Sequence, residues 1–125
     1  MNDNFLKALV NIINTMVDMR SHLSKPEIVG MFYKDTKDIV IYDEFMKESN
    51  LIVNHLMNIK LDIELNPHMN DMINNLLFSN QILMVKPDII IHINDSLKRD
   101  NNKEKWLSFF RLILSNKRTP NKQKE

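Results

Sequence analysis

The side chains that could form a metal site in this sequence are four histidines and their acidic neighbours. The histidines are His22, His55, His68 and His92, and no two of them have the i, i+4 spacing of a helical zinc motif. His68 and Asp71 lie three residues apart on a predicted helix, but catalytic zinc usually takes three protein ligands. We therefore predict that the chain has no metal site.

Four carboxylates between residues 35 and 44 are the nearest approach to an acid–base site. They are Asp35, Asp38, Asp43 and Glu44. General acid–base catalysis needs one carboxyl held in a shielded environment, and the surrounding sequence is polar and typical of a solvated loop. The chain has no cysteine, which excludes a cysteine nucleophile and a disulfide. It has a single glycine, Gly30, whereas a glycine-rich phosphate-binding loop needs several, so such a loop is excluded as well. We expect neither enzymatic activity nor a bound cofactor.

The charge of the chain is divided unevenly along its length. Residues 1–97 hold eight Lys/Arg against thirteen Asp/Glu, whereas residues 98–125 hold nine against three. A basic C-terminal region of this kind predicts binding to an anionic surface, although basic tails also serve solubility alone. The residues that we assign to this anionic-surface site are Lys98, Arg99, Lys103, Lys105, Arg111, Lys117 and Arg118.

The partner expected at this site is an anionic phospholipid surface or another protein. Nucleic acid is a weaker expectation, because the polar side of the last predicted helix lacks the interleaved aromatic residues of single-strand binders. The longest uncharged run, residues 72–85, is shorter than the roughly 20 residues that span a bilayer. The N-terminus has neither the basic start nor the cleavage site of a signal peptide. We expect a cytoplasmic protein that associates with membranes peripherally, if at all.

Helical periodicity predicts most of the secondary structure. The pair Asn66-Pro67 is a typical helix start, because asparagine can cap and proline at the first helical position loses no needed N–H. The run Ile89–Ile91 fits either a helix or a strand. Helices are predicted over residues 4–22, 44–58, 67–85 and 103–115, whereas the segment after Pro87 is left open between a short helix and a strand.

Two segments predict β-structure instead. β-prone runs at residues 28–33 and 39–42 flank the polar loop Lys34–Asp38 and indicate a hairpin. The alternative is two short helices, with Ser24 and Glu27 as a capping box. In Ile59–Leu65, apolar and charged residues alternate without interruption, as in a half-buried strand.

The sequence therefore predicts an α+β fold, in which a helix-rich domain contains a three-stranded antiparallel sheet. The domain covers residues 1–115, and a disordered basic tail covers residues 116–125. The alternative fold is an all-α bundle, in which helices and loops absorb all three strands.

The predicted helix at 103–115 has a broad apolar face that contains Trp106, Phe109 and Phe110. Such a face beside basic residues is typical of an interfacial membrane helix, or of a helix that packs into the core. We predict burial in the core, because the chain has few other aromatic residues with which to fill it. The nine methionines suit an adaptable binding surface, but we assign them mainly to the core as well.

The order of these elements resembles the small late poxvirus proteins needed for virion membrane biogenesis. The stretches that carry the resemblance are Val29–Asp35, Ile39–Asp43, Leu61–Leu65 and Asp88–Asp95. The resemblance implies an α+β fold, a three-stranded antiparallel sheet and phosphoinositide binding through basic surface residues. The last helix is more apolar and less basic than the family pattern, so the lipid-binding residues of the family cannot be transferred. The abundance of Asn, Ile, Lys and Met, which suggests an AT-rich genome, is compatible with a viral source.

A second similarity supports a different function. Glu104-Lys105-Trp106 followed by Phe109-Phe110 is similar to one helix of the small viral helical bundles of the apoptosis-regulator type, although their glycine-containing signature is absent. The similarity implies an all-α module that antagonises a host protein by binding it. The first functional hypothesis is thus a non-enzymatic protein that binds an anionic membrane or an assembly partner, and the second is a protein-interaction module.

Overall fold

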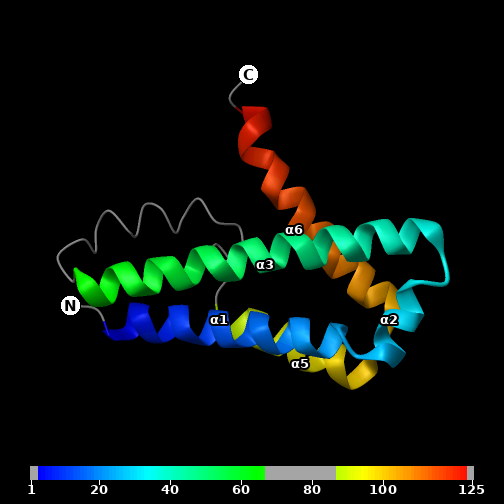
Figure 1. Ribbon diagram of the computed structural model, residues 1–125, viewed down its shortest axis with the longest axis horizontal. Coiled ribbons are helices and arrows are strands. Elements are labelled where there is room, and N and C mark those ends of the chain that lie inside the picture. The colour runs from blue at the N-terminus through cyan, green and yellow to red at the C-terminus, as the bar shows by residue number, and fades with distance from the viewer. Residues whose placement is uncertain (1–2, 67–86, 124–125) are drawn as a thin grey trace.

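The computed structural model describes the backbone of residues 3–66 and 87–123 and the side chains of residues 6–66 and 89–115. Within each of these two ranges the helices are joined by short connections, and neither range contains a strand (Figure 1). The prediction of an α+β fold with a three-stranded sheet is therefore wrong, and the all-α alternative describes the structure. The helices are α1 (Asp3–Leu23), α2 (Pro26–Phe32), α3 (Thr36–Leu65), α5 (Pro87–Asp100) and α6 (Lys103–Gln123).

The segment predicted as a hairpin forms α2 and the start of α3. Pro26 occupies the first turn of α2, where a missing N–H costs nothing. The Asp35 side chain caps α3 by accepting a hydrogen bond of 2.8 Å from the Lys37 backbone N–H. The proposed capping box is absent, because Lys25 is the N-cap of α2 and the Ser24 hydroxyl donates to the Arg20 carbonyl. In this segment, helix caps and tertiary packing outweigh the modest β-preference of residues 28–33 and 39–42.

The segment predicted as a strand, Ile59–Leu65, forms the last two turns of α3. Its alternating pattern also fits a helix, because residues four apart share one helical face. Ile59 and Ile63 are buried on the inner face, whereas Leu61 and Leu65 are exposed on the outer face. The predicted helix over 44–58 is thus the middle of one 30-residue helix.

The long helices α1 and α3 lie side by side and run in opposite directions, as Figure 1 shows. The helix α5 packs along α1, while α6 contacts α3 and crosses it. A polar contact ties α1 to α3, because the Arg20 guanidinium donates to the Met46 carbonyl and, at 2.7 Å, to the buried Ser49 hydroxyl. This framework places the connection between α5 and α6 near the C-terminal end of α1.

An aromatic cluster forms the centre of the core. Phe45 of α3 and Phe110 of α6 stack with ring centroids 4.3 Å apart, and Phe32 of α2 stacks on Tyr42 at 4.9 Å. The side chain of Trp106 is fully buried. The prediction that the aromatic face of the last helix lies in the core is therefore confirmed. Core roles are also confirmed for Met16 and Met19, whereas Met57 is exposed.

The remaining helix predictions differ in outcome. The predictions over 4–22 and 103–115 are confirmed by α1 and α6, and the run Ile89–Ile91, for which helix and strand were both open, lies in the helix α5. The backbone of α6 continues to Gln123, into the segment expected to be a disordered tail. The division into a domain and a tail stays a prediction, and the predicted helix over 67–85 lies outside the described residues.

Candidate functional site

Three of the basic residues assigned to the anionic-surface site form ion pairs within the protein. Lys98 Nζ lies 2.5 Å from an Asp18 carboxylate oxygen, which joins α5 to α1. Lys103 Nζ lies 2.9 Å from a carboxylate oxygen of the buried Asp38, which joins α6 to α3. The third pair is Lys105 with Asp100, at 2.7 Å, across the α5–α6 connection. These charges hold helices together.

The ionisation of these groups reflects the pairing. Hydrogen bonds from Lys98 and then Asn94 lower the pKa of Asp18. The hydrogen bond to Asp38 raises the pKa of Lys103, because that contact stabilises its protonated form. The contact with Lys105 likewise lowers the pKa of Asp100. Each shift favours the charged form that the ion pair requires.

The other predicted site residues have more open surroundings. Arg99 on α5 and Arg111 on α6 are exposed, and neither forms an ion pair with the residues whose side chains are described. Lys117 and Arg118 lie on the α6 backbone, but their side chains are outside the described part. Because Lys98 turns toward α1 and Lys103 toward α3, the structure does not gather the predicted set into one patch. Anionic-surface binding by these residues stays a prediction.

A contact between distant parts of the chain fixes the position of α6. His22 Nε2 lies 2.7 Å from Asn101 Oδ1, and the His22 ring stacks on Trp106 with centroids 6.0 Å apart. Asn101 has a φ of 49°, a left-handed conformation that asparagine tolerates better than most residues. Asn102 Oδ1 then accepts a hydrogen bond of 2.9 Å from the Glu104 N–H and caps α6. His22 is therefore a structural histidine.

Three of the four clustered carboxylates make contacts within the protein. Asp35 caps α3, Asp38 pairs with Lys103, and Asp43 accepts a hydrogen bond from Tyr33 Oη at 2.9 Å. The contact with Asp43 raises the pKa of Tyr33. In the part of the chain described here, no three His, Asp or Glu side chains are grouped closely enough to hold a metal ion. His68 and Asp71 lie outside that part.

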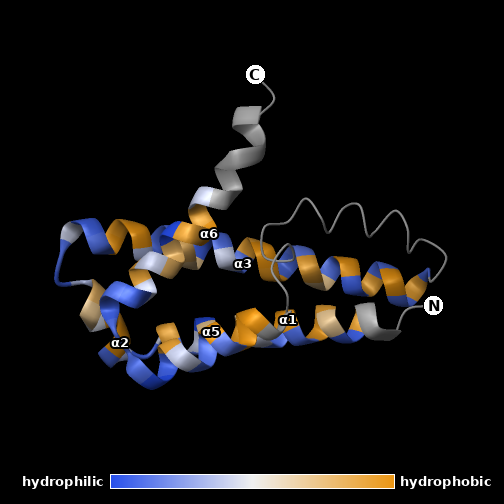
Figure 2. Cartoon of the chain, turned by 180° about the vertical axis from the view of Figure 1, so that it is seen from behind, coloured by the Kyte–Doolittle hydropathy of each residue, from blue (hydrophilic) through white to orange (hydrophobic). Residues whose placement is uncertain are grey.

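The outer face of α3 carries apolar side chains that the sequence reasoning did not identify as a surface. At about 100° per residue, these side chains fall within an arc of about 120°, directly opposite the buried side chains of the same helix. Figure 2 shows that hydrophobic residues recur along the whole length of α3. We call this set the outer stripe, and its members, 48–75% exposed, are Val40, Leu51, Met57, Leu61 and Leu65.

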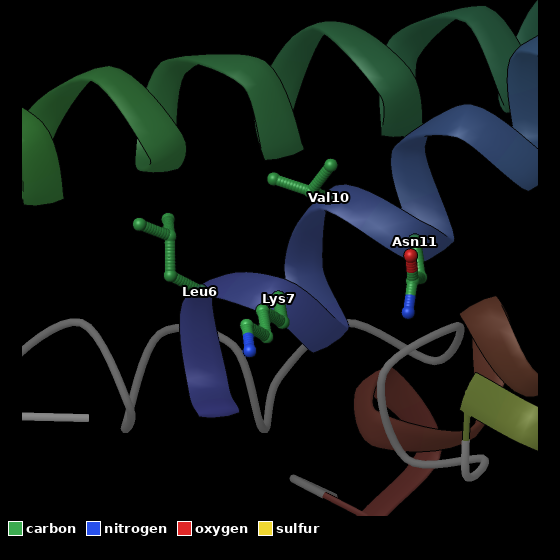
Figure 3. Close-up of a pocket in the computed structure, with 4 residues that line it drawn as sticks. All are labelled: Leu6, Lys7, Val10 and Asn11. Carbon is green, nitrogen blue, oxygen red and sulfur yellow. The ribbon is translucent and has the colours of Figure 1, made fainter. Parts of the chain in front are cut away.

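A pocket lies along the N-terminal half of α1. Its described lining consists of Leu6, Lys7, Val10 and Asn11. In Figure 3, Leu6 and Val10 point toward α3, whereas Lys7 and Asn11 point away from it. These four residues offer one amine, one amide and two aliphatic side chains as binding contacts.

None of the helices, as far as they are described, is long and apolar enough to cross a membrane. No protein-family model, curated protein or solved structure matches the chain. The resemblance to the poxvirus membrane-biogenesis family stays a prediction, and the three-stranded sheet that it implies is absent from the described residues.

Proposed function

We propose that this protein is a non-enzymatic interaction module that binds another protein through the outer stripe of α3. The observation that carries the proposal is the distribution of large apolar side chains that are exposed in the described residues. Five of the nine lie on α3, and all five face away from the core. Apolar side chains that gather on one exposed face are typical of protein-binding surfaces.

The ion pairs favour this function over the anionic-surface hypothesis. Lys98, Lys103 and Lys105 are paired with carboxylates of the same chain, so their charge is partly neutralised before any ligand arrives. An all-helical architecture is also the one expected for a small bundle that antagonises a host protein by binding it. The α+β expectation that accompanied the lipid hypothesis is wrong.

Matched substitutions on two helices test the proposal. Leu61 on α3 and Leu112 on α6 are 53% and 51% exposed, so Leu61→Glu and Leu112→Glu change the surface equally and should leave folding intact. We expect immobilised wild-type protein and Leu112→Glu to capture the same partner from host-cell extract in stoichiometric amounts, and Leu61→Glu to lose it. Equal capture by both variants, with unchanged circular dichroism spectra, would exclude the outer stripe as the binding face.

A weaker second candidate is binding to an anionic membrane through the exposed arginines. Arg99 and Arg111 are the site residues with described side chains that form no ion pair with other described residues. Neutralising Lys98 and Lys103 would disturb the fold, so the informative variant is Arg99→Gln with Arg111→Gln. Flotation with anionic liposomes at low salt should be lost in this variant if the candidate is correct. Flotation equal to that of the wild-type protein would exclude these two residues.

A further inference from the structure

Among the methionines whose side chains the structure describes, Met57 of the outer stripe is the most exposed. Its side chain is 48% exposed, whereas Met16 and Met19 are fully buried and Met31 and Met46 are partly buried against the core. We propose that Met57 is a reversible oxidation site, at which a peroxide converts part of the outer stripe from apolar to polar. The inference rests on the proposed function, because it assigns a regulation to the same binding surface.

The thioether of Met57 is the group that reacts. Its sulfur attacks one oxygen of hydrogen peroxide, and an S–O bond forms as the O–O bond breaks. The displaced hydroxide takes the proton of the transferred hydroxyl and leaves as water. The sulfur loses two electrons and the peroxide gains them, so the products are methionine sulfoxide and water. No thiol of the chain competes for the peroxide, because the sequence has no cysteine.

The reaction can be reversed by methionine sulfoxide reductases. A dithiol supplies the two electrons and becomes a disulfide, and the sulfoxide oxygen leaves as water. Because the chain has no cysteine, the dithiol must come from another molecule. The state of Met57 would therefore follow the balance between peroxide and thiol reductants around the protein.

The position of Met57 in the outer stripe gives the oxidation its effect on the surface. Leu61 lies one helical turn after Met57, and Leu51 and Leu65 lie further along the same outer face, all of them more than half exposed. A sulfoxide at Met57 places a polar hydrogen-bond acceptor within this apolar run. A partner that buries the run must then remove water from the sulfoxide, which weakens binding.

The fold should tolerate oxidation at this position. Met57 lies on the outer side of α3, away from the buried Leu56 and Ile59, so the sulfoxide oxygen can stay in water. Oxidation of Met16 or Met19 would instead place a polar group in the core, and peroxide reaches these side chains only when the helices open. Met57 should therefore be oxidised before them, with no loss of helix.

Limited oxidation with hydrogen peroxide, followed by tryptic peptide mapping, tests the site. The tryptic peptide 48–60 contains Met57 as its only methionine, whereas the peptide 8–20 contains Met16 and Met19. We expect Met57 to be oxidised more than about tenfold faster than Met16 and Met19, with an unchanged circular dichroism spectrum. Equal rates in a protein that keeps its helical spectrum would overturn the inference.

Retention on a hydrophobic-interaction column measures the effect on the surface. Oxidised wild-type protein should elute earlier than untreated protein, and a methionine sulfoxide reductase with dithiothreitol should restore the retention. Met57→Leu keeps the surface apolar and is the matched control, so its retention should change much less. Met57→Gln imitates the polarity of the sulfoxide and should elute early without peroxide. An equal shift of wild-type protein and Met57→Leu would overturn the inference, because other methionines would then cause it.

Capture from host-cell extract connects the oxidation to the proposed function. Oxidised wild-type protein should lose the partner that untreated protein captures, whereas Met57→Leu treated in the same way should keep it. Undiminished capture by wild-type protein that is fully oxidised at Met57 would overturn the regulation. If untreated protein captures no partner, the proposed function fails, and the mapping and retention measurements still decide whether Met57 is the oxidation site.

Discussion

Truncation of Trp106 is the sharpest test of the core. Trp106 is fully buried, and its ring lies 6.0 Å from that of His22, 6.5 Å from that of Phe109 and 5.9 Å from that of Phe110. Trp106→Ala would remove these contacts and leave a cavity, at a cost of about 3–5 kcal/mol. Since unfolding free energies of such domains are about 5–15 kcal/mol, the variant should lose about a fifth or more of its stability.

A second substitution separates packing from polarity. Trp106 Nε1 is buried and has no hydrogen-bond partner among the described residues. An unpaired buried donor costs about 1–3 kcal/mol. Trp106→Phe removes that donor and keeps most of the aromatic contact, so the two effects should offset each other. We expect the free energy of unfolding of Trp106→Phe to lie within about 1 kcal/mol of the wild-type value. The free energy of unfolding of Trp106→Ala should be much lower than both.

The measurement is urea unfolding followed by far-ultraviolet circular dichroism, because the substitutions remove the only tryptophan. Tryptophan fluorescence of the wild-type protein gives an independent check, since a buried indole emits toward the blue without any ligand. A Trp106→Ala protein as stable as the wild type, together with red-shifted emission in buffer, would refute the core assignment. That combination would instead indicate an interfacial anchor that needs a membrane to become buried.

The ion pairs give two further predictions. Lys103→Met should lower the urea midpoint more than Lys105→Met does. Lys103→Met leaves the buried Asp38 carboxylate without its ion-pair partner, whereas Asp100, the partner of Lys105, stays in water. Equal midpoints for the two variants would show that the Asp38 pair does not stabilise the fold. Because the pKa of Asp18 is lower in the folded protein than in the unfolded chain, its ionised carboxylate stabilises the fold at pH values above the unfolded-state pKa of about 3.9. This contribution to stability is lost as the pH falls through the folded-state pKa of Asp18. Asp18→Asn should therefore destabilise the protein at neutral pH but not at the acid end of the profile, and a difference independent of pH would contradict the assignment.

The sequence predicted those helices whose apolar residues occupy one face. In α1, Leu9, Ile12 and Met16 share a buried side, and in α6 the buried residues surround Trp106. In such helices the apolar residues recur at the helical period, which distinguishes them from strands. The burial of Trp106 could be predicted for the same reason, because it lies at the centre of the only broad aromatic face.

The helix α3 was misassigned because it has apolar residues on two opposite faces. Its buried side holds Ile59 and Ile63, and its outer side holds Leu61 and Leu65, so the sequence alternates in the way a strand does. The two-sided pattern was itself the signal of the outer stripe. A second apolar face can be recognised from sequence only after the segment is known to be helical, which is why the surface proposed here to bind a partner was missed.

The division of charge along the chain illustrates a limit of a different kind. A net charge of opposite sign in residues 1–97 and 98–125 indicated that the basic region meets something acidic, and the structure supplies acidic groups within the same molecule. Lys98 meets Asp18 on α1, and Lys103 meets Asp38 on α3, so part of the acidic majority neutralises part of the basic region when the helices pack. The sequence shows that the basic region will attract acidic groups. It does not show whether those acidic groups belong to the same chain or to a binding partner. For Arg99 and Arg111, which form no such pair with the described residues, an external anion remains the alternative, and the liposome experiment with those two residues alone distinguishes the cases.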